Sequence, residues 1–134
     1  MAMFGKKAPP PIKSLIAQGS RIEGNLKFTD GLRIDGEVLG NVTASTETNS
    51  MLVISEQASV VGEVTADHVI INGSVEGPVH ARELLEMQPN ARIKGDVHYR
   101  RLEMHQGAVI AGTLKPLEPA AAEKPLLKLA TTAA

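Results

Sequence analysis

The chain has 134 residues, of which 14 are basic and 15 acidic, and its lack of cysteine excludes a disulfide framework and a cysteine-ligated zinc site. A net charge of -1 is far from the basic balance of a nucleic-acid-binding domain, so no nucleic acid partner is expected. Hydrophobic residues make up 43% of the chain but aromatic residues only 2%, so the core must be built from aliphatic side chains.

Residues 1–11 are expected to form a disordered tail that ends in three consecutive prolines. In this tail the apolar Met3 and Phe4 precede Lys6 and Lys7. An aromatic side chain beside two lysines suits a lipid interface, because the lysines can meet anionic head groups. We therefore predict a membrane contact here, weak for one copy but firm when many copies act together.

Nothing in the sequence suggests export or a membrane span. The prolines interrupt any apolar stretch that could follow the first lysines as part of a signal peptide. No run approaches the roughly 20 apolar residues of a transmembrane helix. The sequence thus predicts a cytoplasmic protein that associates with the membrane from its surface.

Residues 12–117 repeat one pattern, in which two aliphatic residues flank a central glycine at a distance of two positions. The six glycines that define the copies are Gly24, Gly40, Gly62, Gly77, Gly95 and Gly112. Eight residues before each glycine stands a large apolar side chain: Ile16, Leu32, Ile54, Val69, Met87 and Met104. Columns this uniform predict coils that stack with equivalent positions above one another.

Within each copy the apolar residues alternate with other residues, which is the period of a β-strand. Short strands separated by corners, with glycine steps of 16, 22, 15, 18 and 17 residues, indicate a single all-β domain, a parallel β-solenoid. Three sides of about six residues each would account for one coil. The 22-residue step contains a polar stretch, residues 46–50, that we expect to project from one corner.

A solenoid leaves one uncovered coil at each end, and such edges favour pairing unless they are capped. No amphipathic capping helix is evident at either end. The polymer interface is therefore predicted at the apolar residues of the two end coils: Leu15, Ile16, Ile22, Leu26, Leu102, Met104, Ile110 and Leu114.

Residues 118–134 are rich in Ala, Pro and Lys and are expected to be a second disordered tail. Its short apolar stretch, residues 125–129, favours a disordered end with a few leucines over a docking motif.

The polar residues give no sign of catalysis or of a cofactor. His80 and His98 are expected to stack in adjacent coils on an outward column, without a nucleophile beside them. Glu86 and Glu103 share another column, which the repeat itself explains, and no metal site is predicted. Single glycines about 17 residues apart are not a phosphate-binding loop. We therefore expect neither an enzyme nor a nucleotide-dependent protein.

These features together resemble the bactofilin family of bacterial cytoskeletal proteins. The resemblance rests on the Phe/Lys tail, the proline break, residues 22–26 and the paired glycine pattern of residues 32–42, which recurs in residues 71–79. It implies a right-handed three-sided β-helix and nucleotide-independent assembly into non-polar filaments. It also implies a membrane-associated scaffold that localises client proteins such as cell-wall or polarity factors.

Two other functions remain open on the sequence. Columns six residues apart also suit a left-handed hexapeptide acyltransferase, although the column four after each glycine (Phe28, Ala44, Ala66, Ala81, Tyr99 and Pro116) is not regularly aliphatic. The other is a monomeric binding module that uses the face of His80 and His98. Filaments, discrete trimers or monomers in electron micrographs would separate the three.

Overall fold

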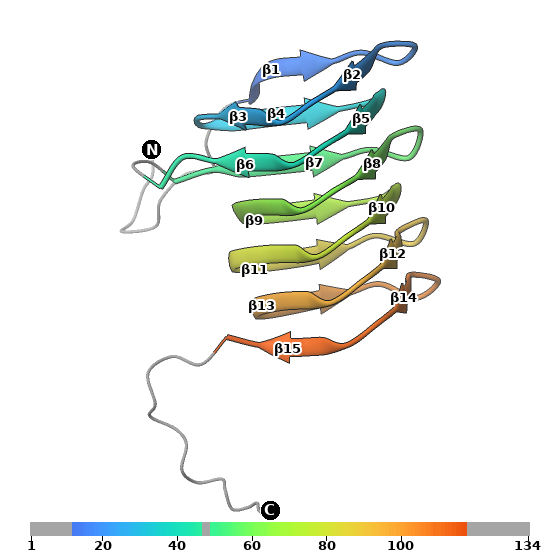
Figure 1. Ribbon diagram of the computed structural model, residues 1–134. Helices are drawn as coiled ribbons and strands as arrows, with labels where there is room; N and C mark the ends of the chain where they lie inside the picture. Colours follow the sequence, from blue (N-terminus) through green and yellow to red (C-terminus); the bar gives the residue numbers. More distant parts are fainter. Residues whose placement is uncertain (1–11, 47–48, 118–134) are drawn as a thin grey trace, which may run out of the picture.

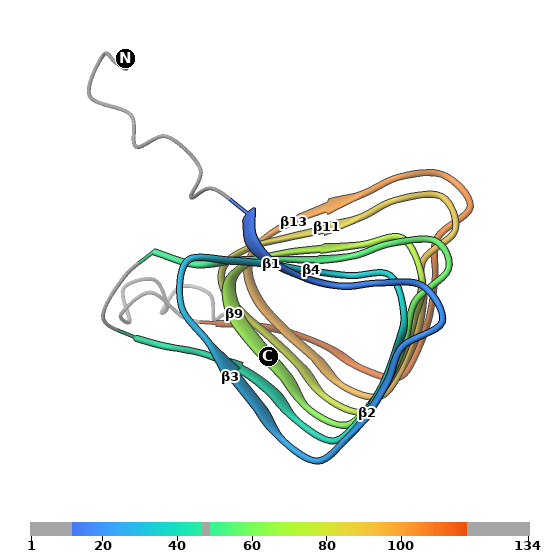
Figure 2. The same ribbon diagram turned by 90° about the horizontal axis from the view of Figure 1, so that it is seen from above.

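The computed structural model describes residues 12–46 and 49–117, and in this part of the chain it contains strands and no helix. The strands stack as a solenoid of six coils with a triangular cross-section (Figures 1 and 2). Every strand pairing is parallel. The predicted three-sided, all-β parallel solenoid of about six coils is confirmed.

Each coil contributes one strand segment to each of three sides. Side 1 holds β1 (Ile12–Ile16), β4 (Gly31–Ile34), β7 (Met51–Ile54) and the second halves of β9 (Val64–Ile71), β11 (Val79–Met87) and β13 (Val97–Met104). Side 2 holds β2 (Arg21–Glu23), β5 (Glu37–Leu39), β8 (Ser59–Val61), β10 (Ser74–Glu76), β12 (Arg92–Lys94) and β14 (Val109–Ala111). Side 3 holds β3 (Leu26–Phe28), β6 (Val42–Ala44), the first halves of β9, β11 and β13, and β15 (Leu114–Pro116).

The direction of winding follows from the two ribbon views. Seen from the N-terminal end, the chain runs clockwise from β1 through β2 and β3 while it descends toward β15 (Figures 1 and 2). A clockwise path that recedes from the viewer is a right-handed helix. The right-handed coil expected from the family resemblance is confirmed, and it differs in hand from a left-handed hexapeptide solenoid.

The core is a set of aliphatic columns that run along the rod. One column on side 2 is Ile22, Val38, Val60, Val75, Ile93 and Ile110, paired in register from coil to coil. Its four middle members are at most 1% exposed. Neighbouring coils lie about 4.7–4.9 Å apart. Aliphatic side chains stacked at this spacing fill the narrow interior.

One predicted column is wrong in two coils. Ile16 pairs with Ile34, which pairs with Ile54, and the column continues through Ile71 to Met87 and Met104. Leu32 and Val69, which stand eight residues before their glycines, belong instead to the neighbouring inward column with Leu52 and Leu85. The error arises because the corner between sides 1 and 2 is two residues shorter in these two coils. The position eight residues before the glycine therefore lies two residues earlier on side 1 than in the other coils.

The corners between sides 1 and 2 come in two lengths. In coils 1, 3, 5 and 6 the corner is a four-residue turn whose fourth N–H donates to the first carbonyl, as Ala58 does to Ser55 at 2.9 Å. These turns project as loops beside β2, β8, β12 and β14 (Figure 1). In coils 2 and 4 only two residues, 35–36 and 72–73, separate the strands. The second residue of each short corner is glycine. At Gly36 a Cβ atom would lie 2.5 Å from the carbonyl oxygens of Ala17 and Ser20 in the preceding coil, which is too close for any other residue.

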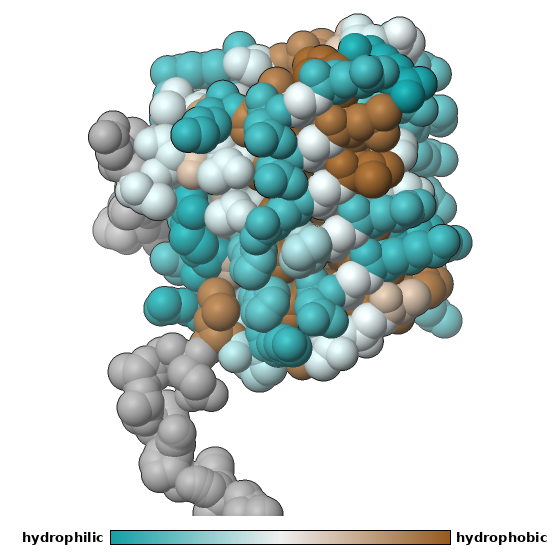
Figure 3. Space-filling view, in the orientation of Figure 1, coloured by the Kyte–Doolittle hydropathy of each residue, from teal (hydrophilic) through white to brown (hydrophobic). Residues whose placement is uncertain are grey.

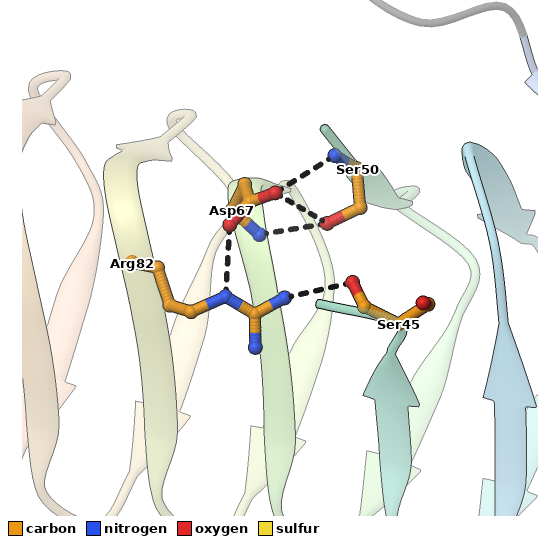
Figure 4. Close-up of polar contacts among 4 residues, drawn as sticks. All are labelled: Ser45, Ser50, Asp67 and Arg82. Carbon is orange, nitrogen blue, oxygen red and sulfur yellow. Dashed lines mark hydrogen bonds and ion pairs between the residues drawn. The ribbon is translucent and has the colours of Figure 1, made fainter. Parts of the chain in front are cut away.

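The long coil is anchored by a polar cluster where β6 leads into β7. Asp67 accepts hydrogen bonds from Ser50 N at 3.0 Å and Ser50 Oγ at 3.2 Å, and it pairs with Arg82 Nε at 2.8 Å (Figure 4). Arg82 also donates to the carbonyl of Ser45 at 3.2 Å. Ser50 is fully buried, and this cluster gives its backbone N–H and its hydroxyl hydrogen-bond partners.

Candidate functional site

The two ends of the rod are the places where the coil-to-coil pairing stops. Among the described strands, β1 and β15 lie at the ends of one sheet, and β2 and β14 lie at the ends of the other. Each of these strands therefore has a row of backbone groups without a strand partner on one side. Such an edge is a template for another strand.

At the C-terminal end the inward columns are left uncovered. Met87 is fully buried, whereas Met104, its register partner in the last coil, is 47% exposed. Val97 is likewise buried, but its partner Leu114 is 43% exposed. The side chains occupy the same columns, so the contrast arises because no further coil follows within the described residues.

The other two predicted residues of this end follow the same pattern. Leu102 and Ile110 are half-buried and pack against the core from the last coil. Their register partners Leu85 and Ile93 are at most 1% exposed. All four predicted residues thus lie on inward columns that end at an open surface.

At the N-terminal end three predicted residues lie on inward columns. Ile22 and Leu26 are half-buried, and Ile16 is 9% exposed. Leu15 is placed differently, because it pairs in register with the exposed Arg33 and is itself 58% exposed. Its side chain lies on the outer face of side 1 and not in the stack that ends at this surface.

Phe28 belongs with the inward residues of the N-terminal end, although the sequence analysis did not select it. It pairs in register with the buried Ala44 and is itself only partly buried against the core. The sequence did contain a sign that this column points inward. It has small alanine residues in the second to fourth coils and large residues in the first and fifth. The end surface is therefore Ile16, Ile22, Leu26 and Phe28.

Figure 3 shows how these ends differ from the rod's length. Hydrophobic side chains gather at the upper and lower edges, while the front between them is mostly hydrophilic. One apolar spot interrupts the side, over β5 and β8, where Leu39 and Val61 are register partners. An apolar end on a polar rod favours contacts at the ends.

The coil-defining glycines stack as a column of their own. Gly62 has φ 146° and a Cβ there would overlap the carbonyl oxygen of Gly40 in the coil before it. The same overlap recurs at Gly40, Gly77, Gly95 and Gly112. Gly24 has nothing within 4 Å of that position, since it lies in the first coil of the described part of the chain. The glycines thus permit close approach of coils, and the first of them is open for such an approach.

The outward polar columns behave as ladders. His80 and His98 are register partners with ring centroids 4.4 Å apart and planes 9° from parallel, which confirms the predicted stack. His80 Nε2 lies 2.7 Å from a Glu63 carboxylate oxygen. The ladder does not continue to Arg82 and Arg100, which are not register partners, and Arg82 pairs with Asp67 at 2.8 Å.

One cluster joins His105 to the column of Glu86 and Glu103. Within the part of the chain that the structure describes, carboxylate oxygens of Glu86 and Glu103 and a ring nitrogen of His105 lie within 4.8 Å of one another, close enough for all three to bind one metal ion. His105 Nε2 lies 3.3 Å from Glu86 Oε2, and Gln88 donates to the same oxygen at 3.0 Å. The corner after β13 brings His105 back toward Glu86. These contacts make an ordinary surface hydrogen-bond cluster, and we assign no metal to it.

The predicted membrane contact, Met3, Phe4, Lys6 and Lys7, lies outside the described residues, as do both predicted tails. Residues 12–46 and 49–117 contain no helix long and apolar enough to span a membrane.

Comparison with known proteins gives one family and one curated relative. The family model described as Bactofilin, polymer-forming cytoskeletal, matches residues 14–115. Bactofilin BacP of Myxococcus xanthus (strain DK1622) is 29% identical over 91 residues, which cover 68% of this chain and 36% of the relative. The match thus spans about a third of that relative's length. No solved structure matches significantly.

Proposed function

Because the chain belongs to the bactofilin family of polymer-forming cytoskeletal proteins, we propose that it assembles end to end into filaments. In this proposal the filaments form without nucleotide, lie against the cytoplasmic membrane and localise client proteins such as cell-wall or cell-shape factors. The scaffold has no catalytic role.

The uncovered end coils carry the proposal. Docking of a second copy would supply the missing coil over Met104 and Leu114, which are 47% and 43% exposed. Burying a whole Leu or Met side chain is worth roughly 1.5–3 kcal/mol, so covering these two half-exposed residues contributes about 2 kcal/mol. The unpaired backbone groups of the end strands add hydrogen bonds to the same contact.

We propose that like ends meet, so that the filament has no polarity. The C-terminal contact would join Leu102, Met104, Ile110 and Leu114 of two copies, and the N-terminal contact would join Ile16, Ile22, Leu26 and Phe28. Each contact is then isologous, with the same residues on both partners. Two different isologous contacts, one at each end of a rod, extend without closing.

The role of the glycines supports nucleotide-independent assembly. They are spread along the rod, one per coil, and five of them lie against the preceding glycine's carbonyl. None of them belongs to a glycine-rich loop with a following Lys and Ser/Thr. Electron microscopy of the purified protein before and after enzymatic removal of ATP and GTP tests this step. We expect equal filaments, and filaments that disappear with the nucleotide would contradict it.

Membrane association is proposed through Met3, Phe4, Lys6 and Lys7, repeated once per subunit along the filament. Each lysine near an anionic surface is worth about 1 kcal/mol, which is too little to hold a single copy. A filament displays many tails and binds by avidity.

Sedimentation with anionic liposomes tests the membrane contact. Full-length filaments should co-sediment, and high salt should release them by screening the lysines. Filaments without residues 1–7 should form but remain free of lipid. Strong lipid binding by these tailless filaments would place the contact elsewhere on the protein.

A further inference from the structure

The outer face of side 1 carries a column that places two aliphatic residues between a cation and two anions. Its members pair in register in the order Leu15, Arg33, Val53, Ile70, Glu86 and Glu103. The column therefore has a cation in the second coil, two aliphatic residues in the third and fourth, and anions in the last two. On side 3 the matching outer column is polar throughout, from Lys27 through Thr43, Thr65, His80 and His98 to Lys115.

The apolar centre extends to the neighbouring outward column. There Met51 pairs with His68 and His68 with Leu84. Met51, Val53, Ile70 and Leu84 are all partly exposed, although they lie in the middle coils, where the structure covers every inward residue. Val53 and Ile70 thus meet solvent side by side, and Met51 and Leu84 lie near them on either side of His68 in the neighbouring column.

From the second to the fifth coil this pattern is self-complementary about the middle of the rod. We propose that side 1 is a lateral contact between two copies of this chain that lie antiparallel, related by a two-fold axis between the third and fourth coils. That axis, lying along the strand direction, places coil 2 of one copy opposite coil 5 of the other. Val53 then faces the partner's Ile70, and Arg33 faces the partner's Glu86.

Each lateral contact has an apolar centre and one Arg–Glu pair on either side of it. Arg33 uses its Nε for Asp35 at 3.0 Å, and its two terminal nitrogens form no hydrogen bond with the described residues. Glu86 accepts from Gln88 at 3.0 Å and lies beside His105, which leaves acceptor sites on its two oxygens. The guanidinium of one copy and the carboxylate of the other can therefore pair.

A parallel arrangement is disfavoured by the same column. It would place Glu86 and Glu103 opposite the identical carboxylates of the second copy and Arg33 opposite Arg33. Like charges directly opposite each other are destabilising. Antiparallel pairing replaces those repulsions with two attractive pairs.

This inference rests on the proposed end-to-end assembly for its strength, because the patch on one subunit is small. Along a filament the contact recurs with every subunit, and many weak contacts then hold two filaments together. A non-polar filament can present the same face in both orientations, which suits an antiparallel contact.

A charge swap within one chain tests the proposal by electron microscopy of filaments at low salt. Wild-type filaments should lie side by side in pairs. Arg33→Glu should give single filaments, because the introduced carboxylate would face the partner's Glu86. The double variant Arg33→Glu/Glu86→Arg should restore the pairs, since each copy then offers both charges with their positions exchanged.

Matched controls lie on side 2, where Glu76 and Lys94 are exposed register partners in middle coils. Lys94→Glu and Glu76→Arg make the same charge changes and should leave filament pairing intact. Arg33→Glu also removes the ion pair with Asp35, so circular dichroism must show an unchanged fold. A purely local defect of that kind would not be repaired at position 86, three coils away.

The possible outcomes separate this contact from end-to-end assembly. Filaments that stay paired in Arg33→Glu, or that stay single in the double variant, would overturn the lateral contact while leaving the filaments themselves established. If no variant forms filaments, end-to-end assembly fails. Sedimentation velocity of the unassembled chain at high concentration then tests the lateral contact, with weak, concentration-dependent dimers expected for wild type and monomers for Arg33→Glu. Wild-type monomers at high concentration would overturn it.

Discussion

The inward columns should tolerate change far less than the outward residues beside them, and Val75 with Glu76 offers the sharpest comparison. Val75 is 1% exposed, between Val60 and Ile93 of the adjacent coils, whereas its neighbour Glu76 is exposed on the outer face. We expect Val75→Asp to destabilise the fold severely and Glu76→Ala to leave it nearly unchanged.

The expected size of the effect follows from two contributions. Removing a fully buried Val side chain forfeits about 1.5–3 kcal/mol of apolar burial. A buried carboxyl group without a partner costs roughly 1–3 kcal/mol more, even after it takes up a proton. The sum of about 3–6 kcal/mol corresponds to a fall in melting temperature on the order of 15–30 °C for a domain of this size. A surface change such as Glu76→Ala should stay within about 0.5 kcal/mol.

Thermal unfolding followed by circular dichroism measures both variants. Ile110→Asp serves as a third point, because Ile110 lies in the same column but is only half-buried in the last coil. Its cost in the unassembled chain should lie between the other two. Equal losses for Val75→Asp and Glu76→Ala would refute the inward and outward assignment.

Three further predictions concern glycine, polar anchoring and pH. Gly62→Ala should destabilise the fold in urea by more than Gly24→Ala, since both have positive φ but only Gly62 lies against a preceding coil; equal losses would contradict the stacking argument. Asp67→Ala should cost about 1–3 kcal/mol, because the backbone N–H and hydroxyl of the buried Ser50 lose their acceptor. Asp96→Ala breaks an exposed pair with Lys115 and should cost under about 1 kcal/mol in the same unfolding assay, and equal losses for the two variants would contradict the anchoring role of Asp67. Hydrogen bonds from Ser55 and Arg33 lower the pKa of Asp35 below its ordinary value of 3.8, so its stabilisation is complete above that pH and is lost as the pH falls further. The melting temperature of Asp35→Asn should therefore fall less between pH 4 and pH 2 than that of wild type, and identical acid profiles would exclude this contribution.

The repeat made the architecture predictable because each column constrains six residues at once. The glycine pattern locates side 2 and the start of side 3 correctly in every coil, from Ile22 to Leu114. Side 1 was harder, since corners of two or four residues shift its strands relative to the glycines. A two-residue shift preserves which residues point inward, so Leu32 and Val69 remained core residues in the wrong column.

The candidate site was only partly predictable. Inward periodicity identified Ile22, Leu26, Met104 and Leu114 as end residues, but it missed Phe28 and included Leu15. Leu15 directly precedes Ile16, and neighbours on a strand point to opposite faces, so one of the two had to lie outside the stack. The approach of His105 to Glu86 depends on the path of a corner, which the spacing of residues does not reveal.

The most direct test of the central claim is the size of end-blocked variants by sedimentation velocity. If like ends meet, Leu114→Arg blocks only the C-terminal contact and should give discrete dimers joined by their N-terminal coils. Leu26→Arg should give dimers joined at the other end, and the double variant should be monomeric. Long filaments from folded Leu114→Arg protein would contradict the end-coil interface, and monomers from either single variant would contradict the meeting of like ends.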